Sequence, residues 1–210
     1  MATQFITRIA LLSGILGFLI AVVDLSAKPT RKDDEPFVQT ASGMTFPAHV
    51  GSFRRANITN YTTDGRNVGV SFNLVDPRNL IAVTAYVYPA RRVYSFGSPQ
   101  NVVNESHRIL EGNEFAAVTK DILAAHPTAK VLSREYALLA AGGQRLPGHR
   151  AVFEYEDVFA GRRQRLVSEA VLFTVGKWYL KYRATGPKAT AASASGSVKK
   201  LIYSLPLPNH

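Results

Sequence analysis

Cysteine is absent from this chain of 210 residues, and its absence excludes several kinds of chemistry. Without thiols there is no disulfide scaffold, no thiolate metal site, no cysteine nucleophile and no lipid anchor on cysteine. The HExxH and GxSxG signatures and the Gly-rich phosphate loop are missing too. The histidines lie singly along the sequence, so a local zinc site is not expected. The sequence therefore predicts no cofactor and no metal centre, and it identifies no reaction.

Long hydrophobic runs are also scarce. The one such run extends from Ile9 to Val23 and follows the single charge of Arg8. A membrane-spanning helix needs about 20 apolar residues, and the core of a signal peptide is shorter. The segment Leu25-Ser26-Ala27 ends in a small residue that suits cleavage by a signal peptidase. Residues 1–27 are therefore predicted to be an export signal that is cleaved before Lys28. The expected location is extracytoplasmic, either periplasmic or secreted; the alternative is an uncleaved segment that anchors the chain in a membrane.

Basic residues outnumber acidic ones, with 25 Lys and Arg against 15 Asp and Glu and a net charge of +10. In an exported protein this balance favours an acidic partner protein, an anionic envelope polymer or a lipid headgroup, and not nucleic acid. Several basic residues occur as adjacent arginines, whose planar guanidinium groups suit carboxylate and phosphate. The candidate binding residues are therefore Arg54, Arg55, Arg91, Arg92, Arg162 and Arg163.

The order of hydrophobic patterns predicts one α+β domain over residues 44–206, after a flexible linker over residues 28–43. Apolar residues at every second position predict an antiparallel hairpin between residues 66 and 88. A helical period follows over residues 102–125 and ends before a proline. Further strands are expected over residues 130–139, 148–158, 162–175 and 177–184, and a last helix over residues 189–203. Strands that are segregated from helices indicate an antiparallel β-sheet flanked by helices.

Particular residues carry a resemblance to a known family. An early Phe46-Pro47, a helix that ends at Ala125-His126-Pro127, and the closing segments Lys177–Leu180 and Lys200–Leu205 resemble the Mog1/PsbP-like fold. The resemblance covers about residues 44–206 and implies an α/β/α sandwich. It also implies relatives that are mostly accessory or partner-binding proteins. No catalytic or binding residue of that family can be matched to this sequence.

The densest acidic group is Glu154, Glu156 and Asp157. Two carboxylates on one strand face can divide acid and base roles in an enzyme. Arginines follow directly after Ala160-Gly161, however, and opposite charges on facing strands are ordinary complements in a sheet. A two-residue turn at Ala160-Gly161 places Glu156 opposite Arg165. The sequence therefore predicts solvent-facing ion pairs for this group.

Three functions remain open from the sequence alone. The leading hypothesis is an exported, non-enzymatic accessory or binding domain that recognises an anionic partner through its arginine-rich surface. The rival is an exported hydrolase with a dispersed active site, which a pocket containing a histidine bonded to a carboxylate would favour. A membrane-anchored structural protein of the envelope is the third. His126 is expected to act as a cation at the end of its helix.

Overall fold

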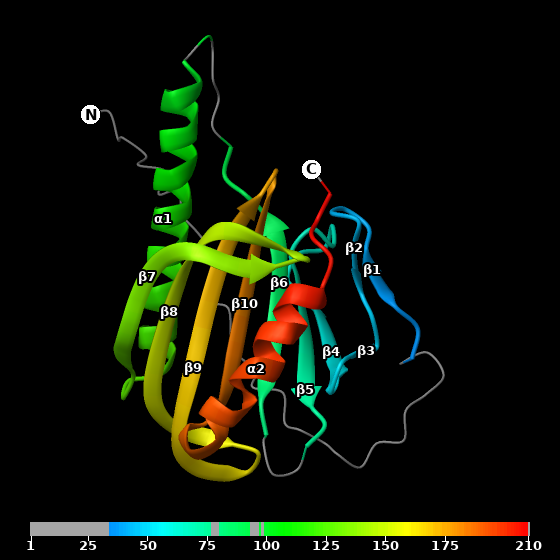
Figure 1. The fold of residues 1–210 in the computed structure, drawn as a ribbon, viewed down its shortest axis with the longest axis vertical. Coiled ribbons are helices and arrows are strands. Elements are labelled where there is room, and N and C mark those ends of the chain that lie inside the picture. Colours follow the sequence, from blue (N-terminus) through cyan, green and yellow to red (C-terminus); the bar gives the residue numbers. More distant parts are fainter. Residues whose placement is uncertain (1–33, 77–79, 93–96, 98, 210) are drawn as a thin grey trace, which may run out of the picture.

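The computed structural model describes residues 34–76, 80–92, 97 and 99–209. The predicted export signal lies outside these residues, and so does the start of the predicted linker. The described chain forms one antiparallel sheet of eight strands and a separate hairpin of two short strands (Figure 1). The hairpin pairs β1 (Phe37–Gln39) with β2 (Met44–Phe46). In sheet order the eight strands are β3 (His49–Val50), β4 (Phe53–Asn60), β5 (Val68–Leu74), β6 (Ala82–Pro89), β10 (Trp178–Pro187), β9 (Arg162–Val175), β8 (Gln144–Phe159) and β7 (Lys130–Ala141).

The predicted strands all belong to this sheet. The hairpin expected between residues 66 and 88 is formed by β5 and β6, and β7 to β10 follow one another as an antiparallel meander. The two parts join where β6 pairs with β10, which places Tyr88 opposite Tyr179. The prediction of one antiparallel sheet flanked by helices is therefore confirmed.

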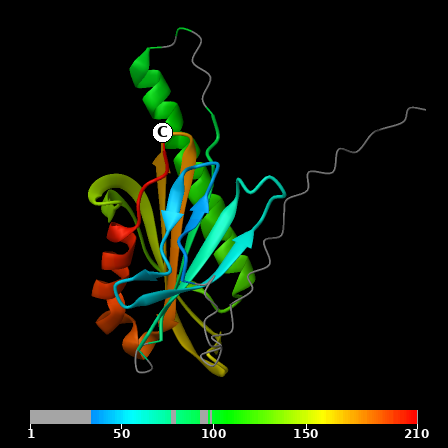
Figure 2. The same cartoon turned by 90° about the vertical axis from the view of Figure 1, so that its right-hand side faces the viewer.

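Two helices cover opposite faces of the sheet. The helix α1 (Gln100–Ala125) packs on β8 and β9, and α2 (Lys188–Ser204) packs on β7, β9 and β10. Figure 1 shows α1 behind the sheet and α2 in front of it, and Figure 2 shows α2 at one side of the sheet. The two faces are called here the α1 face and the α2 face. Their apolar side chains form separate clusters, with Phe115 and Phe153 in the cluster on the α1 face and Phe72 and Trp178 in the cluster on the α2 face.

The start of the domain differs from the prediction. The linker was expected to reach residue 43, but Phe37–Gln39 already form β1 and Gln39 is buried. The side chain of Gln39 donates to the carbonyl of Gly65 at 2.9 Å and accepts from the backbone N–H of Ser42 at 2.8 Å. These bonds order a segment that has no apolar periodicity. The linker prediction is therefore wrong from Phe37 onward.

Strand β4 is an element that the sequence did not reveal. Buried and exposed side chains do not alternate regularly along Phe53–Asn60, and the register of β4 with β5 shifts between Arg55 and Asn57. A β-bulge of this kind interrupts the period of two on which strand prediction relies. In the described part of the chain no helix is both long and apolar enough to cross a membrane.

Candidate binding face and a buried histidine network

The α1 face has a half that α1 covers only at its margin, where the Glu114 carboxylate accepts from Tyr88; this half is called here the open half. It comprises the α1-facing side chains of β4, β5 and β6 together with Lys181 on β10. Because side chains alternate along a strand, the apolar residues of β5 and β6 point to the α2 face and their neighbours point to the α1 face. The neighbours are polar or aromatic: Ser71, Asn73, Thr84, Tyr86 and Tyr88. Figure 2 shows β4 and β5 at the side of the sheet away from α2.

Lys181 is the charged centre of the open half. Its Nζ lies 4.2 Å from the centre of the Tyr86 ring and 5.7 Å from that of the Tyr88 ring. No described carboxylate lies within ion-pair distance of this Nζ. Burial lowers the pKa of Lys181 to about 8, and the nearby charge of Arg183 acts in the same direction, whereas the carboxylates of Glu114 and Asp121 on α1 act in the opposite direction. The tyrosine rings favour the charged form, so the group is an ammonium at neutral pH with little water around it.

The tyrosines around Lys181 are held in place by their own contacts. Tyr61 stacks on Tyr86 with ring centres 6.1 Å apart, and Gly69 beneath them leaves room for the Tyr61 ring. The hydroxyl of Tyr88 donates to the Glu114 carboxylate on α1 at 3.0 Å. Burial raises the pKa of Tyr86 to about 12 and also raises the pKa of Tyr88. Both rings therefore stay neutral and present fixed aromatic faces to the ammonium.

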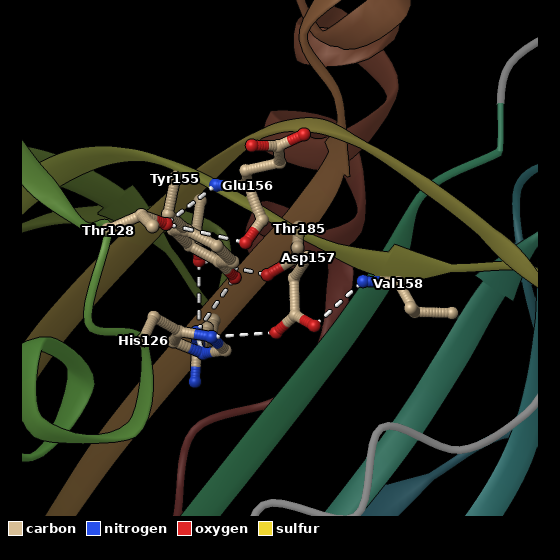
Figure 3. Close-up of polar contacts among 9 residues, drawn as sticks. His126, Thr128, Tyr155, Glu156, Asp157, Val158 and Thr185 are labelled. Atoms are coloured by element: carbon tan, nitrogen blue, oxygen red, sulfur yellow. Dashed lines mark hydrogen bonds and ion pairs between the residues drawn. The ribbon is translucent and has the colours of Figure 1, made fainter.

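A second group of polar residues lies under the end of α1 (Figure 3). His126 follows α1 directly and is 5% exposed. Its Nδ1 lies 2.9 Å from the Oδ2 of Asp157 on β8, and its Nε2 lies 2.9 Å from the Nη2 of Arg183 on β10. The imidazole also stacks on Tyr155 with ring centres 4.0 Å apart. The residues His126, Asp157, Arg183, Tyr155 and Ser168 are called here the histidine network.

The partners of His126 determine its protonation state. A guanidinium can only donate, so Nε2 accepts from Arg183 and Nδ1 carries the proton that is donated to Asp157. Burial lowers the pKa of His126, and the charge of Arg183 lowers it further. The residue is therefore a neutral imidazole. The prediction of a cation at the helix end is wrong, because that prediction considered the helix alone.

Arg183 joins the remaining members of the histidine network. The side chain is 8% exposed, donates to the Tyr155 hydroxyl at 3.0 Å and donates from Nε to the Ser168 hydroxyl at 3.1 Å. The hydroxyl groups of Ser168 and Thr185 lie 2.9 Å apart. Every nitrogen of His126 thus has a protein partner, and no lone pair is available to take a proton from a substrate. A buried histidine with both nitrogens engaged fits a structural role better than that of a general base.

The acidic group divides between two roles. The predicted register at Ala160-Gly161 is confirmed, since Phe159 pairs with Arg162 and Glu156 pairs with Arg165. Positive φ angles of 50° at Ala160 and 75° at Gly161 form the tight turn. The nearest ion-pair atom to Glu156 belongs to Arg163, at 3.7 Å.

The other two carboxylates bond to separate elements. Glu154 pairs with Lys188 at the start of α2, at 2.7 Å. Asp157 points to the α1 face and bonds to His126, and its other oxygen accepts from the backbone N–H of Val158 at 2.7 Å. These carboxylates do not converge on one site.

The predicted arginines lie in three separate places. Arg54 faces Asn73 on the α1 face of β4 and belongs to the open half. Arg55 points to the α2 face and donates to the carbonyl of Phe46 at 2.7 Å. Arg91 and Arg92 are exposed just beyond β6, near the turn between β9 and β10.

The third pair is distant from the others. Arg162 and Arg163 lie at the turn between β8 and β9, at the opposite end of the sheet from the turn between β9 and β10. The structure therefore brings these side chains into no common surface. Binding by any one of them stays a prediction.

Lys181 and the histidine network were not found by sequence reasoning. Lys181 stands two residues from Tyr179 in a strand that reads as an ordinary aromatic segment. His126 and Asp157 were each noted separately, and they are 31 positions apart. The register of β8 with β9 gave the side of the sheet to which Asp157 points, and the helix end gave the place of His126. What was missing is the fact that α1 ends over β8 and β10.

Comparisons with known proteins give a weak resemblance and no family. No protein-family model and no curated protein sequence matches the chain. Among solved structures, the chain resembles the solution structure of cyanobacterial PsbP (CyanoP) from Synechocystis sp. PCC 6803. The match has 10% sequence identity and a TM-score of 0.44, and it covers 82% of this chain and 91% of that chain. This is a weak resemblance at the level of the fold, as the sequence predicted.

Proposed function

We propose that this chain is an extracytoplasmic, non-enzymatic binding domain that recognises an anionic partner on the open half of its sheet. The observation that carries the proposal is the Lys181 ammonium, held over two tyrosine rings without a described carboxylate within ion-pair distance. A cation in a partly dehydrated setting binds a carboxylate or phosphate more strongly than one in open water. Arg54 on β4 adds a second positive charge to the same face.

The arrangement of His126 argues against the rival hydrolase. The pair of His126 and Asp157 is the histidine and carboxylate combination that a dispersed site requires, with 2.9 Å between Nδ1 and Oδ2. In a hydrolase of this type the other nitrogen faces a nucleophilic hydroxyl. Here it faces Arg183, and Ser168 bonds to Arg183 as well. This geometry favours a structural role for the histidine network and argues against an active site there.

The first test is capture of the partner from the envelope fraction of the source organism on the immobilised mature chain. We expect retention to fall steeply as salt is added to the wash, because screening shortens to about 3 Å at 1 M. The Lys181→Met variant keeps the apolar stem and removes the charge, so it should retain much less partner. The matched control is Lys177→Met, which removes an exposed lysine from the neighbouring turn. Retention that ignores salt, or equal loss in both variants, would contradict the proposed face.

Export is tested separately from binding. N-terminal sequencing of the protein from its host should give a mature chain that begins at or near Lys28. An intact Met1 in the membrane fraction would instead support the anchored envelope protein. This outcome leaves the binding face untouched, since residues 1–27 contribute none of the residues of the open half.

A further inference from the structure

The sheet ends in two unlike edges. At one edge β3 has 2 residues and pairs only with Phe53 and Arg54 of β4. At the other edge β7 runs for 12 residues and, among the described strands, pairs with β8 alone. Figure 1 shows β7 at the margin of the sheet. A long edge strand presents a row of backbone N–H and C=O groups that can pair with another extended chain.

The second half of β7 lacks the side chains that protect an edge. Natural edge strands avoid pairing by being short or by carrying charges or proline. The segment Tyr136–Ala141 contains neither a charge nor a proline. Tyr136 is 48% exposed and Leu138 is 57% exposed, and the register with β8 places both on the α1 face together with Arg134. The outer part of β7 therefore combines an open backbone with exposed apolar side chains.

We infer that β7 binds an extended segment of another protein by β-strand addition. In this mode the main-chain hydrogen bonds supply affinity, and alternate side chains supply specificity. Apolar residues of the segment would pack beside Tyr136 and Leu138. A carboxylate would lie beside Arg134, whose guanidinium carbon is 5.4 Å from the centre of the Phe115 ring and which has no described carboxylate within ion-pair distance.

Charge favours an acidic segment over a second copy of this chain. The net charge of +10 makes two copies repel each other. A two-fold pairing of β7 with itself centred on Arg134 or Glu135 places like charges directly opposite, which destabilises a sheet. An acidic segment is attracted by the net charge of this chain and does not place like charges opposite Arg134. This surface lies at the far edge of the sheet from the open half, so the inference stands independently of the proposed function.

The probe is a pair of short synthetic peptides, one with alternating Val and Glu and one with alternating Val and Lys. Hydrogen exchange of the full chain is followed with each peptide. We expect the Val and Glu peptide to slow exchange of backbone amides within Tyr136–Ala140 and the Val and Lys peptide to leave them unchanged. Slowed exchange at other amides and not within Tyr136–Ala140, or the same effect from both peptides, would overturn the inference.

Substitutions on β7 provide the second readout. Leu138→Glu and Arg134→Glu should each weaken binding of the Val and Glu peptide by about tenfold, which corresponds to roughly 1.4 kcal/mol. The control is Val158→Glu, since Val158 is 50% exposed on β8 and lies off the edge. Circular dichroism checks that all three variants fold. Unchanged affinity in Leu138→Glu refutes strand addition at this edge, and a dimer that Leu138→Glu dissociates would assign the edge to a second copy.

Discussion

Two cations of the same strand and the same sheet face have opposite surroundings. Arg183 lies under the end of α1, where His126, Tyr155 and Ser168 take up its donors. Lys181, two residues along the same face, lies over two tyrosine rings and has no described carboxylate within ion-pair distance. The difference follows from where α1 ends, because the residues after the helix reach Arg183 and not Lys181. One face of the sheet thus contains both a closed structural network and the proposed binding face.

The largest expected effect is the difference in the free energy of unfolding between variants that remove Arg183 and Lys181. Arg183→Met leaves the acceptors on His126, Tyr155 and Ser168 unpaired in a buried place, so we expect the free energy of unfolding to fall by about 3 kcal/mol. Lys181→Met keeps the packing and loses a cation–π contact, which amounts to less than about 1 kcal/mol. Urea unfolding of both variants measures the contrast. Equal losses would mean that Lys181 is also a structural residue and would weaken the proposed binding face.

An intermediate effect is expected from the pH dependence of the histidine network. The pKa of His126 lies below its ordinary value of 6.5, first because of burial and then because of Arg183. Between that lowered pKa and 6.5 the unfolded chain binds more protons than the folded one, so stability falls as the pH falls. The stability advantage of the wild type over His126→Gln should therefore be complete above 6.5 and shrink below it. His149, whose pKa is also lowered, is present in both proteins and cancels.

Unfolding midpoints in urea at a series of pH values give this difference directly. An advantage that grows on acidification would mean that His126 is protonated in the fold and that Arg183 does not donate to it. That result would reopen the possibility of a proton-transferring histidine.

The smallest effect is expected at the acidic group beside the turn. Glu156 is exposed and its nearest ion-pair partner, Arg163, is 3.7 Å away. Glu156→Gln should therefore change the free energy of unfolding by less than about 1 kcal/mol and leave partner capture intact. Asp157→Asn, its neighbour on the opposite face, should cost more because it disturbs His126. A large functional loss in Glu156→Gln with unchanged folding would revive a role for this carboxylate in catalysis.

Prediction from sequence succeeded where a local pattern repeats. The period of two in β5 and β6 and the helical period of α1 were read correctly, as was the turn that pairs Glu156 with Arg165. It failed at Phe37–Gln39, which side-chain bonds order, and at β4, where a bulge breaks the period. It also failed at His126, since its charge depends on Arg183, 57 positions away.

The sequence by itself determined the order of the elements from β5 onward, the antiparallel sheet and the absence of thiol chemistry, because these follow from residue types and their spacing along the chain. Only the tertiary structure decided which polar residues became partners. Alternation states that Lys181 and Arg183 share a face, but the site at which α1 crosses that face depends on how its apolar side chains pack against β8 and β9. That packing places His126 within hydrogen-bond distance of Arg183. It leaves the Lys181 ammonium without a described carboxylate within ion-pair distance.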